Sequence, residues 1–102
     1  MIILELRLGE NKMSKVYIGL GSNMGDKIGN LEKAVALLLD HEKISINKVS
    51  AYYLTKPVGY LAQDDFINQV IEITTTLKPY ELLEYCQDIE KKLHRKREIR
   101  EQ

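Results

Sequence analysis

The alternating run from Phe66 to Leu77 constrains the fold more than any other feature of this sequence. It is rich in β-branched residues, and successive side chains of a strand point to opposite faces of a sheet. One face is apolar and consists of Ile67, Ile71, Ile73 and Leu77. The other is mixed and consists of Phe66, Asn68, Val70 and Glu72. We predict a strand whose isoleucine face packs against helices, which leaves Phe66 and Asn68 on the face open to a ligand.

Two helical patterns and two further strand-like runs accompany this strand. Val16–Leu20 is a short apolar run, and a helix is expected from about Asp26, its candidate N-cap, to about His41. Ile44–Leu54 predicts a second strand, with a bulge where its alternation slips. Pro79 is suited to the first position of a second helix that frays into a basic tail near Leu93 or a little beyond. The apolar stripe of that helix consists of Leu82, Cys86, Ile89 and Leu93.

The resulting order is strand, helix, strand, strand, helix. These are five of the six elements of an α+β, ferredoxin-like split βαβ sandwich, with the final strand missing. Ile2–Leu8 also alternates, so residues 1–12 are either an N-terminal extension or an extra edge strand, and Met13 could equally be an internal start of a domain spanning 13–102. We hypothesise that Ile2–Leu8 pairs antiparallel with Val16–Leu20. The alternative is self-association through the open edge of that strand.

Composition excludes several classes of protein. With 102 residues, 44% hydrophobic and 29% charged, the sequence predicts one globular domain. A formal net charge of zero favours neither nucleic acid nor an anionic membrane. The single cysteine, Cys86, excludes an intrachain disulfide and a multi-thiolate metal site. No apolar run approaches the roughly 20 residues of a membrane span, and no signal-peptide pattern begins the chain, so a cytoplasmic location is expected.

The segment from Leu54 to Asn68 carries the strongest indication of a ligand. Pro57 and Gly59 restrict and bend the backbone before Phe66 and Asn68 begin the next strand. An aromatic ring for stacking and an amide for a polar edge suit a flat heteroaromatic ligand. The alternative is a long hairpin loop in which Phe66 caps the core.

A basic tail follows the second helix. In an extended segment Arg95 and Arg97 would project to the same side and could clamp polyphosphate oxygens, with Glu90 nearby to accept from an amine or a ribose hydroxyl. The alternative is a solvated helix end whose cations favour the helix dipole. A nucleic-acid contact lacks support because the tail contains no aromatic residue.

Other polar residues carry weaker indications. Gly19-Leu20-Gly21-Ser22-Asn23 lacks the ending of a Walker loop and the third glycine of a dinucleotide fingerprint, so a tight turn is favoured. His41 and His94 have no partners at ligand spacing, and the pair Asp64 and Asp65 is expected to be solvated. No metal ligands and no nucleophile–base pair can be assembled.

Four blocks in register resemble the 6-hydroxymethyl-7,8-dihydropterin pyrophosphokinases, from about Lys15 to about Glu98. They are Tyr17-Ile18-Gly19-Leu20-Gly21-Ser22-Asn23, Tyr53-Leu54-Thr55-Lys56-Pro57-Val58-Gly59, Asp65-Phe66-Ile67-Asn68 and Ile89-Glu90-Lys91-Lys92-Leu93-His94-Arg95. The resemblance implies transfer of pyrophosphate from ATP to the hydroxymethyl group of the dihydropterin, in folate biosynthesis, with Mg²⁺.

The resemblance also implies the residues of the site. Thr55, Pro57 and Val58 would line the pterin pocket, Phe66 would stack on the ring and Asn68 would bond its polar edge. Gln87 and Glu90 would lie on the nucleotide side, with Arg95 and Arg97 against the triphosphate. Gly21-Ser22-Asn23 would support the floor of the site.

The sequence also departs from the family pattern. The family continues into a Trp-Gly-Pro-Arg-Thr-like stretch and an Asp-x-Asp strand that holds the Mg²⁺ ions, whereas this sequence ends at Gln102. His94 stands where glycine is common in the family. We therefore expect a truncated member with impaired transfer; the alternative is a non-catalytic ferredoxin-like binding or interaction module.

Overall fold

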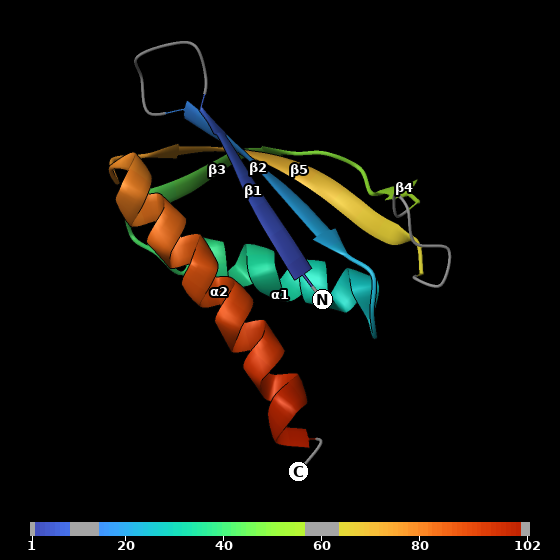
Figure 1. Ribbon diagram of the computed structural model, residues 1–102. Coiled ribbons are helices and arrows are strands. Elements are labelled where there is room, and N and C mark those ends of the chain that lie inside the picture. The colour runs from blue at the N-terminus through green and yellow to red at the C-terminus, as the bar shows by residue number, and fades with distance from the viewer. Residues whose placement is uncertain (1, 9–14, 57–63, 101–102) are drawn as a thin grey trace.

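The structure is a computed structural model that describes the backbone of residues 2–8, 15–56 and 64–100, and the side chains of 15–56 and 64–93. Its strands form one antiparallel sheet in the order β1-β2-β5-β3, with β4 also paired to β5 (Figure 1). These strands are β1 (Ile2–Leu8), β2 (Lys15–Ser22), β3 (Ile44–Val49), β4 (Tyr53–Thr55) and β5 (Phe66–Thr75). The β2-α1-β3 unit is split by β5, which lies between its two strands, as the ferredoxin-like prediction requires.

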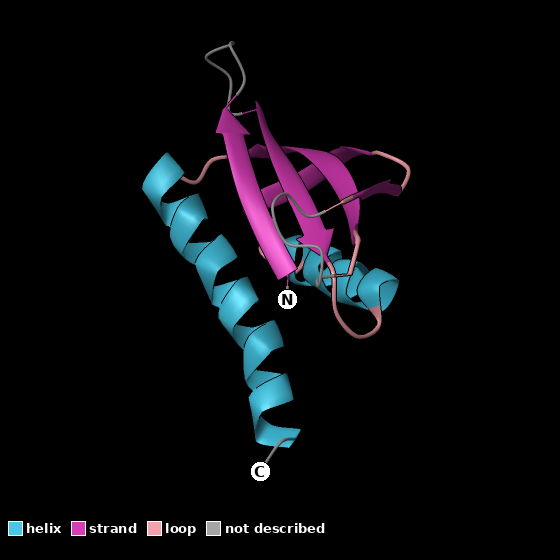
Figure 2. Cartoon of the chain, turned by 45° about the vertical axis from the view of Figure 1, so that its right-hand side comes forward, coloured by secondary structure: helices cyan, strands magenta, loops and turns pink. Residues whose placement is uncertain are grey.

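Both helices lie on one side of this sheet (Figures 1 and 2). α1 (Lys27–Leu39) begins as predicted, because the carboxylate of its N-cap, Asp26, accepts a hydrogen bond from the amide of Gly29 at 3.0 Å. α2 (Pro79–Arg100) begins at the predicted proline.

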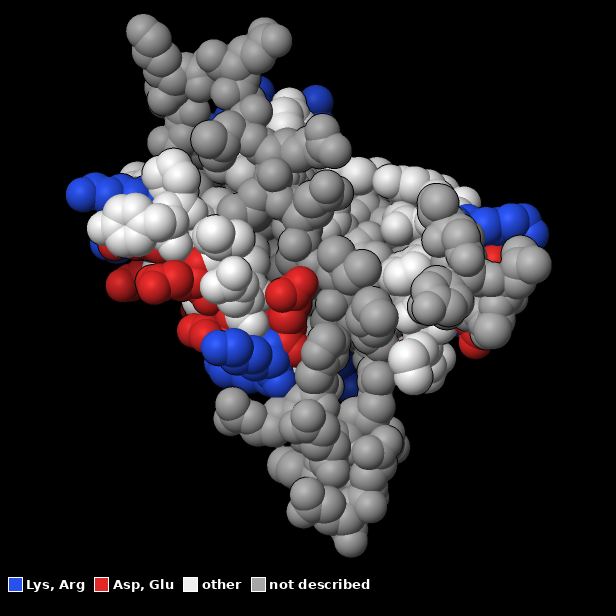
Figure 3. Space-filling view, viewed as in Figure 1, with Lys and Arg blue, Asp and Glu red and all other residues white. Residues whose placement is uncertain are grey.

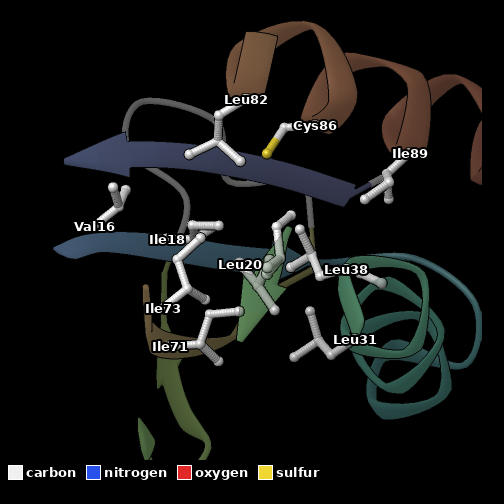
Figure 4. Close-up of a cluster of buried hydrophobic side chains, with 12 residues drawn as sticks. Val16, Ile18, Leu20, Leu31, Leu38, Ile71, Ile73, Leu82, Cys86 and Ile89 are labelled. Atoms are coloured by element: carbon white, nitrogen blue, oxygen red, sulfur yellow. The ribbon is translucent and has the colours of Figure 1, made fainter. Parts of the chain in front are cut away.

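The core fills the space between the helices and the sheet (Figure 4). Ile71 and Ile73 are fully buried there, which confirms the prediction that the isoleucine face of β5 meets the helices. The predicted stripe of α2 packs into the same cluster, with Leu93 at its margin. The opposite face of the sheet therefore carries the mixed set of β5 residues, Phe66, Asn68, Val70 and Glu72, all partly buried.

The N-terminal strand has the predicted partner. β1 pairs antiparallel with β2 over its whole length, from Ile2 opposite Ser22 to Leu8 opposite Val16. This pairing occupies the edge of β2 through which self-association was the alternative. Residues 9–14, which join the two strands, lie outside the described residues.

The single strand predicted over Ile44–Leu54 is wrong, because two strands occupy that range. The predicted bulge is present, between Ile46 and Lys48, but the chain leaves the sheet again at Ser50. There the Ser50 hydroxyl accepts a hydrogen bond from the Val70 amide N–H at 2.8 Å. The Ser50 amide N–H donates a hydrogen bond to the Val70 carbonyl, also at 2.8 Å. A side chain thus takes the place of a backbone partner and separates β3 from β4.

The basic tail takes the second of its two predicted forms, a helix end rather than an extended segment. The α2 helix continues to Arg100, well beyond Leu93. Positions two apart on an α-helix are separated by roughly 200° around its axis. The backbone therefore does not support the same-side clamp that an extended Arg95–Arg97 segment would form.

Candidate functional site

Phe66 and Asn68 open β5 on the face that the helices leave uncovered. Both side chains are partly buried, and neither belongs to the core cluster. Their β5 neighbour on the other face, Ile67, packs against that cluster. The structure thus confirms that the ring and the amide share the helix-free face, and it excludes Phe66 as a cap on the helix-packed core.

The amide of Asn68 is held by the neighbouring strand. Its Nδ2 donates to Thr55 Oγ1 at 2.8 Å, and more weakly to the carbonyls of Tyr53 at 3.3 Å and Phe66 at 3.4 Å. Thr55 is the register partner of Phe66, and Tyr53 is the partner of Asn68. The pairing of β4 with β5 therefore brings together three of the predicted pterin residues: Thr55, Phe66 and Asn68.

The hydrogen bonds of Asn68 leave its side-chain oxygen, rather than its nitrogen, for a ligand. The Nδ2 donors of Asn68 are used by the protein, and no described residue donates to its Oδ1. An amide oxygen accepts hydrogen bonds. The site therefore presents an acceptor whose orientation Thr55 maintains.

Gly21 of β2 provides the space on the other side of Asn68, its register partner. A Cβ at Gly21 would lie 3.0 Å from Asn68 Oδ1 and 3.4 Å from Phe66 Cδ2. The absent side chain lets both residues lie against the backbone of β2. Sequence reasoning had given this segment a supporting role at the floor of the site, without identifying these contacts.

Pro57 and Val58, the other predicted pterin residues, lie outside the described residues. Immediately before β5, Lys27 Nζ donates a hydrogen bond to the Asp65 carbonyl at 3.0 Å. Sequence reasoning missed this contact, since the 38 positions between the two residues leave no pattern to detect.

The predicted nucleotide residues come from α2, the helix that packs on the other face of the sheet. Gln87 is exposed and Glu90 is partly buried, while the side chains of Arg95 and Arg97 lie outside the described part. Acidic side chains gather over the first part of α2 (Figure 3), among them Glu84 and Asp88. This acidic surface does not favour a polyphosphate, so the assignment of the triphosphate to Arg95 and Arg97 stays a prediction.

Two further titratable residues, His41 and Cys86, are held in packing contacts that suit a structural role. His41 packs edge-on against Tyr85 with ring centroids 4.8 Å apart, and its Nδ1 accepts the Lys43 amide at 3.0 Å. Burial, and then the charge of Glu90, raise the pKa of the Cys86 thiol to about 12. Cys86 is therefore a core residue, as predicted, and an unreactive one at neutral pH.

Two classes of feature are absent from the described part of the chain. No three His, Cys, Asp or Glu side chains lie together there as a metal ion would require. None of its helices combines the length and the apolar character needed to cross a membrane.

Comparison with known proteins identifies the family to which a chain with this site belongs. The family model for 7,8-dihydro-6-hydroxymethylpterin-pyrophosphokinase (HPPK) matches residues 17–102. This chain belongs to the HPPK family. The match includes every predicted site residue and leaves β1 outside.

Curated relatives carry the corresponding name, 2-amino-4-hydroxy-6-hydroxymethyldihydropteridine pyrophosphokinase. The protein of Bacillus subtilis (strain 168) is 52% identical over 84 residues, which cover 82% of this chain and 50% of the relative. That of Methylorubrum extorquens is 46% identical, covering 86% of this chain and 56% of the relative. That of Aquifex aeolicus is 42% identical, covering 82% and 51%. The HPPK chain described here thus spans about half the length of these relatives.

Proposed function

We propose that this chain acts in the cytoplasm in folate biosynthesis and takes part in the transfer of pyrophosphate from ATP to 6-hydroxymethyl-7,8-dihydropterin. The observation that carries the proposal is the arrangement of Phe66 and Asn68 against Gly21, with the Asn68 amide oriented by Thr55. Membership of the HPPK family supports it.

The described residues suit the pterin half of this reaction. The Phe66 ring would stack on the bicyclic pterin, because flat aromatic groups gain from offset stacking. The Asn68 Oδ1 would accept a hydrogen bond from a ring or exocyclic N–H. Together the two contacts would fix both the plane and the rotation of the pterin, and so the position of its hydroxymethyl oxygen. Thr55, Pro57 and Val58 would complete the wall of the pocket.

The nucleotide half is assigned to the second helix. Gln87 and Glu90 would contact the nucleoside, and Arg95 and Arg97 would neutralise the triphosphate. Pyrophosphoryl transfer depends on positioning and charge neutralisation rather than on a covalent nucleophile. The family's Mg²⁺ would add to that neutralisation, but the described residues do not fit a Mg²⁺ site, so we assign it no ligands here.

Calorimetric titration of 6-hydroxymethyl-7,8-dihydropterin into the wild-type chain and Asn68→Leu tests the proposal. Leucine keeps the branched shape and the number of side-chain heavy atoms of Asn68, and it removes both the acceptor and the hydrogen bond to Thr55. We expect binding by the wild type and at least about tenfold weaker binding by the variant, equivalent to about 1.4 kcal/mol.

Asn47→Leu is the matched control. Asn47 is an exposed asparagine of β3 whose Nδ2 donates to Glu72 Oε2 at 3.2 Å and to Thr74 Oγ1 at 2.8 Å. Its substitution should leave pterin affinity unchanged. A wild-type chain that does not bind the dihydropterin, or equal affinities for all three proteins, would overturn the proposal.

Catalysis needs a separate measurement. Release of AMP from ATP, with the dihydropterin and Mg²⁺ present, distinguishes transfer from binding alone. Impaired transfer by this chain, which the resemblance led us to expect, stays a prediction until that assay. Binding without AMP release would favour the non-catalytic binding module.

A further inference from the structure

Asn23 contains an unsatisfied acceptor. The residue is only 3% exposed, and its Oδ1 is buried without a hydrogen-bond partner, alone among the side-chain atoms of the described residues. A buried polar atom left unpaired is destabilising, so such atoms are rare in native proteins. The position therefore calls for a donor from outside the described structure.

The register of the sheet locates Asn23 beside the pterin face. Ser22, the last residue of β2, pairs with Ile67, so the next position falls opposite Phe66. The Lys27 side chain, at the start of α1, reaches the Asp65 carbonyl, so the chain that follows Asn23 stays within side-chain reach of the segment that enters β5.

The side of the sheet follows from the neighbours of Asn23. The hydroxyl of Ser22 accepts the Asn30 Nδ2 of α1 at 3.0 Å, so Ser22 faces the helices. Gly21 faces Phe66 and Asn68 on the opposite side. Asn23 is one position beyond β2, and extending the alternation of the strand by that one residue assigns it to the side of Gly21.

Two amide oxygens that accept no hydrogen bond from a described residue are thus assigned to the same face, one from Asn23 and one from Asn68. Two acceptors select a ligand edge that carries donors. The amino-pyrimidinone edge of a pterin has such donors in its 2-amino group and its N3–H. The 2-amino group alone carries two N–H bonds, which gives it a donor for each of two acceptors.

We propose that Asn23 is a specificity-determining residue whose Oδ1 accepts a hydrogen bond from the 2-amino group of the bound dihydropterin. This inference rests on the proposed function, because it assigns a second amide to the same site. It also explains a buried acceptor that no contact among the described residues satisfies.

Comparing two ligands separates this role from a purely structural one. Wild type and Asn23→Leu are each titrated with the 7,8-dihydropterin and with the corresponding 7,8-dihydrolumazine, in which a carbonyl oxygen replaces the 2-amino group. The wild type should prefer the pterin by at least tenfold, and Asn23→Leu should lose most of that preference. An equal loss of affinity for both ligands would mean a structural role, and would overturn the inference.

A measurement on the wild type covers the case in which Asn23→Leu does not fold. With ¹³C-labelled asparagine, the Asn23 side-chain carbonyl resonance should shift on adding the pterin and not on adding the lumazine, while that of Asn47 should remain unchanged with either. An unshifted Asn23 resonance at pterin saturation overturns the inference while leaving the proposed function intact. If the wild type does not bind the pterin, the proposed function itself has failed.

Discussion

Gly21 is a residue at which the backbone of β2 lies close to the candidate site. The Asn68 oxygen and the Phe66 ring occupy the space that any other side chain would need. The geometry of the site therefore depends on the absence of a Cβ at Gly21 as well as on the Asn68 and Phe66 side chains.

Gly21→Ala should weaken pterin binding by about tenfold, or about 1.4 kcal/mol. The new methyl group would stand 3.0 Å from Asn68 Oδ1 and force that oxygen away from its present position. Calorimetric titration with the dihydropterin measures the loss.

Gly25→Ala provides the contrasting control for this prediction. Gly25 has a φ of +67°, and a Cβ there would meet no atom within 4 Å. The variant should lose about 1 kcal/mol of stability from backbone strain while keeping its affinity. Equal affinities for Gly21→Ala and the wild type would contradict the role given to Gly21.

At the scale of elements, α1 shows how a local signal and a close contact combine. The Asp26 carboxylate caps the helix through the Gly29 amide, and a Cβ at Gly29 would overlap that carboxylate. Glycine usually weakens a helix, but here its small size makes room for the cap.

The two positions should therefore behave non-additively. Asp26→Ala should cost about 1 kcal/mol of unfolding free energy through loss of the cap. Gly29→Ala should fail to stabilise the wild type, yet stabilise the Asp26→Ala variant by up to about 1 kcal/mol. Urea unfolding of the two single variants and the double variant measures these differences. Strictly additive free energies would show that the cap and the glycine are independent.

At the scale of the whole molecule, one core joins the sheet to both helices. Cys86 lies in that cluster, and its pKa is raised from 9.0 to about 12, first by burial and then by Glu90. Burial also raises the pKa of Tyr85, with smaller contributions from Asp40 and Cys86. Both groups thus resist ionisation only while the protein is folded.

Alkaline pH should therefore destabilise the fold. Between pH 9 and about 12 the unfolded chain releases the Cys86 proton while the folded chain retains it, so stability falls as the pH rises. The expected slope approaches about 1.4 kcal/mol per pH unit for this thiol. Urea unfolding under reducing conditions from pH 8 to 10.5 measures it. Cys86→Ala should be less stable at pH 8 but show a shallower slope, whereas identical slopes would contradict the assignment.

Much of the fold could be predicted because its signals are local. The alternation of Phe66–Leu77, the Asp26 cap and the apolar stripe of α2 each depend on near neighbours, and each is confirmed. The break at Ser50 could not be predicted, because it depends on hydrogen bonds to Val70, twenty positions away. The helical form of the basic tail was one of two open alternatives, because its charges suit a phosphate clamp and a solvated helix end equally well.

By itself the sequence determined which residues face the helices, which face remains for a ligand, and that Phe66 and Asn68 lie on it. Those properties follow from the period of a strand and the chemistry of each side chain. Only the tertiary structure decided that Thr55 holds the Asn68 donors, that Gly21 makes room for the Asn68 oxygen, and that Asn23 is left with a buried acceptor. These depend on strand register, which brings together residues that are distant in the chain.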